Sequence, residues 1–165
     1  GTSIGQLHWD GGANGPSDST VQLAFLVGGR QNLGERAFAT YHFSYSEGAG
    51  ENIMAFAGTD ANAVLDATGN LKTFPAFAAV FGFGYDLTST LTTQGSYAYG
   101  VLDTPDSRDA LALERGGVAH LNLVWTPKNN EYFSTGAEIM YGKVRVQNGA
   151  TGDATRLQLM AKFTF

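Results

Sequence analysis

The sequence lacks cysteine, long apolar runs and runs of positive charge, and each absence excludes a class of protein. Without cysteine there is no disulfide scaffold and no thiolate metal site. No stretch approaches the roughly 18 consecutive apolar residues of a membrane-spanning helix, so residence in a membrane would have to use strands. The net charge of -5 and the absence of a basic run argue against a nucleic-acid surface. Only 15% of the residues are charged, which is few for a soluble surface.

The clearest positive signal is the alternation of side chains in the last twelve residues, 154–165. One face of a strand there would carry Leu157, Leu159, Ala161, Phe163 and Phe165, and the other would carry Arg156, Gln158, Met160, Lys162 and Thr164. A half-buried strand of a soluble sandwich would alternate in the same way. The terminal phenylalanine, with another two residues earlier, resembles the assembly signal of outer-membrane β-barrels. A barrel strand shows lipid one face and a polar lumen the other.

Seven further segments alternate with a period of two and are predicted to be strands. They are Ser3–Asp10, Val21–Arg30, Arg36–Ser46, Ala76–Tyr85, Leu91–Val101, Ala119–Thr126 and Phe133–Gly142. Apart from the brief last connection at 148–153, short and longer connections alternate, as do the periplasmic turns and external loops of barrels. We therefore expect one all-β unit over residues 1–165, an antiparallel meander with long external loops near 47–72 and 103–116. In the second loop the DALALER stretch predicts a helical turn.

The apolar faces of these strands predict contact with lipid. Between residues 76 and 85, five large side chains alternate with five small ones, which suits lipid outside the wall and open space or close packing inside it. Trp125 and Tyr85, near the periplasmic strand ends, are expected in an aromatic girdle. The residues expected to face lipid are Phe77, Phe81, Phe83, Leu121, Leu123, Ile139, Leu159 and Phe163.

The segments HLNLVWTPKNNEYFSTGAEIMYGK and GDATRLQLMAKFTF resemble the end of DcaP-like porins, with its A-N-L-x-W-x-P stretch, G-x-E strand and G-D-x-S-R-x-Q finish. The matching positions are His120, Asn122, Trp125, Pro127, Gly136, Glu138, Gly142, Gly152, Asp153, Arg156 and Gln158. A looser likeness extends back to about Leu33. The resemblance implies a transmembrane β-barrel of the bacterial outer membrane that forms a water-filled channel for passive diffusion. Because the family forms sixteen-stranded trimers associated with small dicarboxylates, it also implies a homotrimer and a small anionic solute.

The eight predicted strands correspond to the carboxyl-terminal half of such a barrel, so two architectures stay open. In the first, the strands pair with a missing amino-terminal half of the barrel. In the second, they close alone as an eight-stranded barrel, whose interior is just wide enough to be filled by its own side chains. Small residues such as Ala76, Gly82 and Ser96 would fill that interior poorly. An open half would in turn expose two sheet edges to lipid, which requires partner strands.

Charge placement predicts which residues line the pore. Arg156 and Lys162 share the polar face of the last strand, and Glu138 is expected beside them on the adjacent strand. Glu138 is the one acid that falls clearly within a predicted strand, whereas several cations do, and such a surplus lowers the barrier for anions. Lys143 and Arg145 could instead lie at the rim and contact lipopolysaccharide phosphates among the outer-membrane lipids. The remaining pore-lining candidates are Gln158, His120, Asn122, Gln94 and His42.

Two other functions stay open. His42 and Ser44 are neighbours on one strand face, with Glu47 nearby, and this H-x-S pair resembles lipid A deacylases, small barrel hydrolases in which histidine activates serine. Those enzymes carry the pair near the chain end and on the lipid side, whereas here it is early and on the presumed lumen side. A structural barrel anchor is the third possibility. His8, His42 and His120 lack metal-ligand spacing, and none of these functions requires a cofactor.

Overall fold

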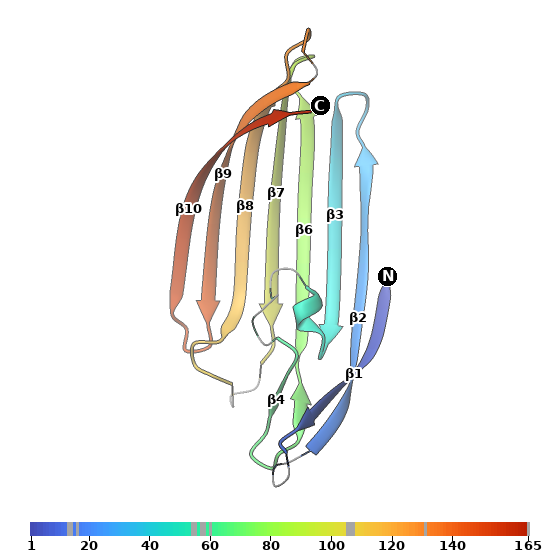
Figure 1. Ribbon diagram of the computed structural model, residues 1–165, viewed down its shortest axis with the longest axis vertical. Coiled ribbons are helices and arrows are strands. Elements are labelled where there is room, and N and C mark those ends of the chain that lie inside the picture. The colour runs from blue at the N-terminus through green and yellow to red at the C-terminus, as the bar shows by residue number, and fades with distance from the viewer. Residues whose placement is uncertain are drawn as a thin grey trace.

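Eight long antiparallel strands form the main sheet, seen in a computed structural model that describes residues 1–12, 15, 17–53, 56, 59, 61–104, 108–130 and 132–164 (Figure 1). Each strand pairs with its neighbours along the chain, which confirms the predicted meander. The terminal Phe165 lies outside the described residues. The strands are β1 (Thr2–Asp10), β2 (Ser17–Asn32), β3 (Ala37–Glu47), β6 (Pro75–Asp86), β7 (Leu91–Leu102), β8 (Leu113–Trp125), β9 (Phe133–Val146) and β10 (Thr151–Phe163).

The sheet is an open, curved wall. Its strand order runs from β1 to β10 without returning, so among the described residues these two strands form the edges. The short connections 33–36, 87–90 and 126–132 lie at one end of the wall together with the carboxyl terminus, and we call this the turn end (Figure 1). The opposite loop end carries the connections 11–16, 48–74, 103–112 and 147–150.

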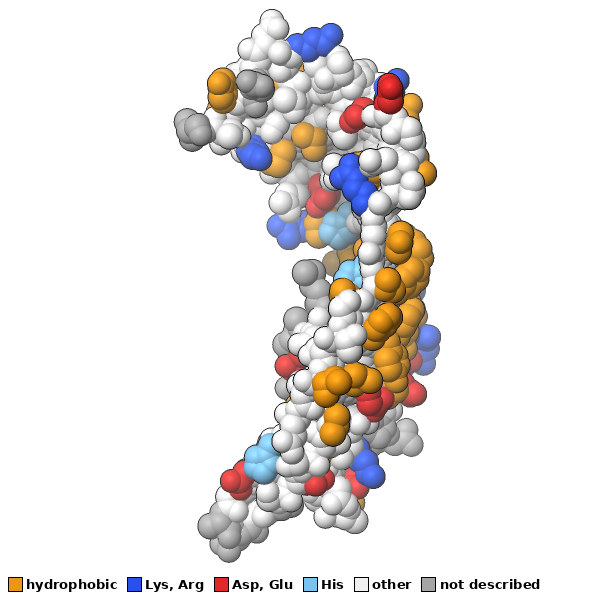
Figure 2. All heavy atoms as spheres, turned by 90° about the vertical axis from the view of Figure 1, so that its right-hand side faces the viewer, with side chains coloured by type: hydrophobic (Ala, Val, Ile, Leu, Met, Phe, Trp, Pro, Cys, Tyr) orange, Lys and Arg blue, Asp and Glu red, His pale blue; other side chains and the backbone are white. Residues whose placement is uncertain are grey.

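The register of the ladder gives the wall two chemically different faces. From β2 to β10, apart from a bulge near Leu113, paired residues are either both odd or both even, as in Tyr41 with Phe81 and Glu138 with Gln158. Odd positions therefore form one continuous apolar face and even positions a polar face. Each of the eight residues expected to face lipid lies on the apolar face and is at least 43% exposed. Figure 2 shows a band of hydrophobic side chains along the convex side of the curved wall.

Strand β1 departs from this parity. It pairs odd with even residues of β2, as in Leu7 with Thr20 and Trp9 with Asp18, so Leu7 and Trp9 lie on the polar face. His8 consequently lies on the opposite side from His42 and His120, and its Nδ1 atom is 2.8 Å from the hydroxyl of Ser19. The alternation within β1 therefore does not determine which face of the wall His8 lies on, because register rather than sequence spacing decides the face.

The described residues of 48–74, here called the inner segment, fold back over the polar face at the loop end. Within the loop predicted there the chain forms a 3₁₀ turn, η1 (Gly50–Asn52), and a hairpin of β4 (Ala63–Leu65) and β5 (Leu71–Thr73). Among the described residues, no helix is long and apolar enough to cross a membrane. The segment and the wall share one hydrophobic core, made of Ile53, Phe56, Ala61 and Phe74 from the segment and Ala76, Ala78 and Leu102 from β6 and β7.

Several strands extend farther toward the loop end than their alternation predicts. Strand β8 begins at Leu113 rather than near Ala119, and β9 continues to Val146 rather than Gly142. The DALALER stretch, residues 109–115, was predicted to form a helical turn. In the structure a turn covers only its first residues, closed by the bond from the Ala112 amide to the Asp109 carbonyl, and β8 begins at Leu113. Glycines 116 and 117 interrupt the sequence pattern, but pairing with β7 and β9 keeps this backbone extended.

We expect replacement of Phe74 by alanine to release the inner segment from the wall. Phe74 is 1% exposed, and a buried Phe→Ala change costs about 3–5 kcal/mol through lost burial and the cavity that remains. Limited proteolysis and amide hydrogen exchange of the segment measure the loss. Leu33→Ala is the control, because Leu33 is 58% exposed in a short turn. Equal protection of the segment in both variants would contradict the packing described.

Candidate functional site

A row of polar side chains crosses four adjacent strands near the middle of the polar face. Gln94 on β7 pairs with Asn122 on β8, which pairs with Glu138 on β9, and Glu138 pairs with Gln158 on β10. Paired residues of an antiparallel ladder have their Cβ atoms about 4.5–5.5 Å apart. Four of the predicted pore-lining residues are therefore next to one another on a single face.

A second row lies one step closer to the loop end. It joins Ser96 on β7, His120 on β8, Met140 on β9 and Arg156 on β10. The Nδ1 atom of His120 is 3.5 Å from a carboxylate oxygen of Glu138 in the first row. The two rows thus bring an acid, a histidine and an arginine together. We call the polar residues of these rows the polar band.

Arg30 completes the second row from the other side, and the list of pore-lining candidates omitted it. It pairs with Thr40, whose row continues through Gly82 to Ser96, so Arg30 and Arg156 lie in one row at opposite ends of seven strands. Its guanidinium lies 3.6 Å from the centre of the Phe38 ring, a cation–π contact. Arg30 lies in a segment that alternates with a period of two, so the sequence was sufficient to predict the face on which it lies.

The residues of the polar band on β7, β8 and β9 line a hollow in the wall of about 400 Å³. Gly82 and Gly95 line it without side chains of their own, which leaves space above the backbone. A Cβ atom at Gly84 would stand 2.2 Å from a carbon of the Phe38 ring, so glycine there lets that ring lie across β6. The residues around the hollow include Arg30, Phe38, Thr40, Gln94, Ser96, His120, Asn122 and Glu138.

The last two candidates lie on the polar face but apart from the band. His42 pairs with Gly28 and Val80, one row closer to the loop end than Arg30. Lys162 pairs with Ser134 near the turn end. The eight predicted residues therefore share one face, yet they do not form one cluster.

The structure decides between two alternatives for Lys143 and Arg145, and it corrects one prediction about acids. Lys143 and Arg145 are odd residues of β9 and lie on the apolar face, so they add nothing to the charge of the polar face. The prediction that Glu138 is the one acid clearly within a strand is wrong, because further acids among the described residues lie within the strands, near their ends. They are Asp10, Asp18, Glu47, Asp86, Glu114 and Asp153. At the middle of the polar face, the charged side chains of the main strands are Arg30, Arg156 and Glu138.

No protein-family model matches the sequence, and no curated protein matches it. Among solved structures, the chain is similar to the outer membrane channel DcaP of Acinetobacter baumannii, with a TM-score of 0.76 and 20% sequence identity. The match covers 100% of this chain and 54% of the DcaP chain. The fold is that of about half a DcaP barrel. At this identity the likeness concerns the fold alone, and the chain spans about half the length of DcaP.

In this DcaP-like wall, His42 and Ser44 are neighbours on the polar face, as predicted. Ser44 is 9% exposed, at the edge of the area that the inner segment covers. Glu47 is an odd residue, and its carboxylate accepts hydrogen bonds from Thr73, at 2.8 Å, and Tyr45, at 3.4 Å. Glu47 is therefore engaged elsewhere, and the geometry gives no support to its orienting His42 for catalysis. Among the described residues, no group of three acidic or histidine side chains could hold a metal ion.

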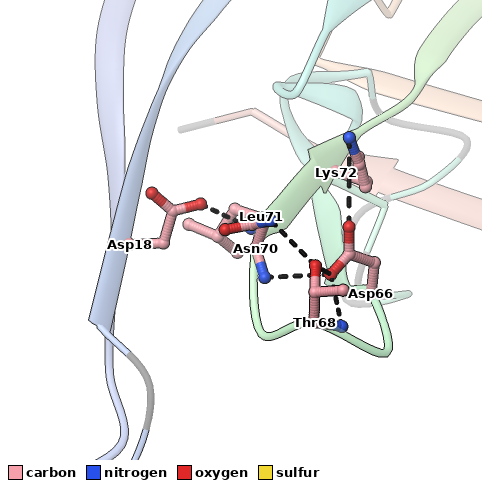
Figure 3. Close-up of polar contacts among 6 residues, drawn as sticks. All are labelled: Asp18, Asp66, Thr68, Asn70, Leu71 and Lys72. Carbon is pink, nitrogen blue, oxygen red and sulfur yellow. Dashed lines mark hydrogen bonds and ion pairs between the residues drawn. The ribbon is translucent and has the colours of Figure 1, made fainter.

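Polar contacts anchor the hairpin of the inner segment to β2 (Figure 3). Asp18 on β2 accepts a hydrogen bond from the Leu71 amide at 2.7 Å. Within the hairpin turn, one carboxylate oxygen of Asp66 accepts bonds from the amides of Thr68 and Asn70, and from the Thr68 hydroxyl at 2.6 Å. The bonds from Thr68 and Asn70, assisted by the charge of Lys72, lower the pKa of Asp66.

Arg108, in the connection between β7 and β8, contacts both the inner segment and the first residue of β8. Its guanidinium donates to the carbonyls of Thr59 and Leu113 and lies 5.0 Å from the centre of the Phe74 ring. Phe74 is thus packed between the wall and a cation. These contacts join two long connections of the loop end into one structure over the polar face.

We expect the hairpin turn at Asp66 to loosen in acid. A carboxyl group whose pKa is lowered by folding stabilises the fold above its ordinary value of 3.8, and this contribution is lost as the pH falls through the lowered pKa. Hydrogen-exchange protection of the Thr68 and Asn70 amides, followed from pH 6 to pH 2, should be constant at first and then fall.

Asp66→Asn should reduce that protection at pH 6 and remove its dependence on acid. Asp109→Asn is the matched control, because Asp109 accepts a bond from the Leu111 amide in a different connection. If the Asp66 variant kept full protection at pH 6, the assignment of the turn to these bonds would be wrong.

Proposed function

We propose that the protein is part of a porin-like channel in a bacterial outer membrane, through which small solutes diffuse passively. The observation that carries this proposal is the division of one curved wall into an apolar convex face and a polar face with an open hollow. A barrel wall between lipid and water requires this division. The similarity in fold to the outer membrane channel DcaP supports it.

The solute we propose is small and anionic, of the dicarboxylate class that the sequence resemblance implies. Arg30 and Arg156 flank the polar band, and Lys162 lies on the same face near the turn end, whereas Glu138 is the acid of the band. His120 lies 3.5 Å from Glu138, which places a hydrogen-bonding group beside that negative charge. In a narrow pore such fixed charges act at short range on a partly dehydrated ion.

Replacing Arg156 and Lys162 together by glutamine should lower the permeability of anions relative to cations. The measurement is the reversal potential of the purified channel in a planar bilayer under a salt gradient near 0.1 M. Glu138→Gln should shift the potential in the opposite direction. The differences should shrink near 1 M salt, because the Debye length falls from about 10 Å to about 3 Å.

Lys143→Gln is the matched control for that experiment, since Lys143 lies on the adjacent strand but on the apolar face. It removes one positive charge, against two in the double variant, and does so on the other side of the wall. A reversal potential that did not move in the double variant would rule out the proposed anion preference. Loss of a lipid-hydrolysing activity in Ser44→Ala would instead favour the hydrolase.

The two sheet edges support the inference that further strands complete the barrel. Strands β1 and β10 each have one edge of backbone groups without a partner among the described residues. In hydrocarbon an unsatisfied backbone group costs several kcal/mol, so an open wall cannot remain unpaired there. We propose that the partner strands belong to the amino-terminal half of a longer barrel, and that complete barrels form the homotrimer that the resemblance implies.

We expect the natural polypeptide to have about twice the mass of these 165 residues. Mass spectrometry of the protein extracted from its own membrane measures the chain mass after denaturation and the number of copies in the native state. A polypeptide of only this length that assembles in pairs would point to a barrel closed by two copies. A monomer of this length would contradict the partner-strand proposal.

A further inference from the structure

A cluster of cations lies outside the polar band, on the apolar face at the loop end. Arg115 on β8 pairs with Arg145 on β9, and Gly117 pairs with Lys143 in the next position of the same two strands. All are odd residues, so they share a face with Leu121 and Ile139. The proposed channel function makes no use of this cluster, because it lies on the other side of the wall from the pore.

The cations surround a hollow of about 450 Å³. Three tyrosines, Tyr97, Tyr99 and Tyr141, form its other borders. A Cβ atom at Gly117 would stand 2.9 Å from the Tyr97 hydroxyl and 3.2 Å from the Tyr99 ring, so the glycine makes room for both tyrosines above the backbone. The hollow therefore combines aromatic walls, a hydroxyl group and cationic side chains.

Two acids moderate the charge of the cluster. Glu114, beside the bulge in β8, lies 3.0 Å from the Nε atom of Arg145 and 3.7 Å from that of Arg115. Asp153 pairs with Lys143 on β10. With three cations and two acids the cluster keeps one net positive charge. Glu114 engages the Nε atom of each arginine, and both side chains remain about 40% exposed, at 39% and 41%.

The position of the cluster along the strand identifies its surroundings. On β8, Arg115 is ten residues from Trp125, which lies on the same face at the turn end. With a rise of about 3.4 Å per residue and a strand tilt of about 40°, this separation is about 26 Å along the barrel axis, against about 25 Å for the apolar band of such barrels. The cluster is therefore at the level of lipid head groups when Trp125 lies at the opposite interface.

We propose that Arg115, Lys143 and Arg145 form a binding site for a phosphorylated lipid head group in the leaflet at the loop end. This proposal rests on the proposed membrane location. Guanidinium groups bind phosphate through paired N–H donors, and tyrosine is favoured at the membrane interface, so the cluster and its borders match the two parts of one amphipathic ligand. The acyl chains of that lipid would lie along the apolar face toward Leu121 and Ile139.

The test is native mass spectrometry of the purified channel titrated with bisphosphorylated lipid A, with its monophosphorylated form and with phosphatidylcholine. We expect the bisphosphorylated lipid to bind most tightly. Replacing Arg115, Lys143 and Arg145 by glutamine should weaken its binding by about tenfold or more, since each cation near a lipid surface contributes to attraction. The matched control, Arg156→Gln with Lys162→Gln, removes cations from the other face and should bind as the unchanged protein does.

Lys143→Gln alone decides the matter if the triple variant fails to fold, because among the described residues Lys143 has no ion pair to lose. It should weaken lipid A binding several-fold. Equal binding by wild type and Lys143→Gln, or full displacement of the lipid by millimolar inorganic phosphate, would overturn the proposal. Conductance in phosphatidylcholine bilayers separates the lipid-site proposal from the channel proposal. The triple variant should conduct as the wild type does. A wild type that binds lipid A but does not conduct would contradict the channel proposal and leave the lipid site supported.

Discussion

The hydrogen-bonded register of the main sheet is the constraint on which the other features depend. Because every pairing from β2 to β10 outside the bulge at Leu113 preserves parity, the face of each side chain follows from its residue number. A slip of one residue in a single pairing would exchange the two faces of every strand beyond it. A slip between β8 and β9, for example, would place Glu138 on the opposite side from Asn122, and Lys143 and Arg145 on the opposite side from Arg115.

The polar face is itself divided into two parts by side-chain size. Toward the loop end it presents Ala76, Ala78 and Leu102, and Phe56 and Phe74 of the inner segment bury these residues. Farther toward the turn end it presents the polar band, whose side chains stay accessible around a hollow. Packing a phenylalanine against small apolar residues stabilises the fold, whereas covering polar groups that have no hydrogen-bond partner costs free energy. The chemistry of the wall therefore limits how far the inner segment extends over it.

Period-two alternation was sufficient to predict the strands and the side of its own strand on which each pore-lining candidate lies. These sides form one face because the register from β2 to β10 preserves parity. Arg30 could have been found by the same rule. The parity of β1 could not, since it depends on the register of β1 against β2, which the alternation within either strand does not determine. Nor could the docking of the inner segment, which joins Phe56 to residues some twenty to forty-five positions later, such as Ala76 and Leu102. Local pattern carries no information about such distant packing.

The placement of cations shows why composition is a weak guide to the local charge of either face in this fold. The chain as a whole is acidic, with a net charge of -5, yet the cations of β9 and β10 divide between two environments. Lys143 and Arg145 lie on the apolar face, whereas Arg156 and Lys162, on the neighbouring strand, lie on the polar face. Because exposed charges are screened over about 10 Å at moderate salt, a side chain acts mainly on the compartment that it faces. Around the hollow the charges of Arg30 and Glu138 balance. Arg156 adds a positive charge farther along the same row, so the middle of the polar face is positive although the chain as a whole is negative.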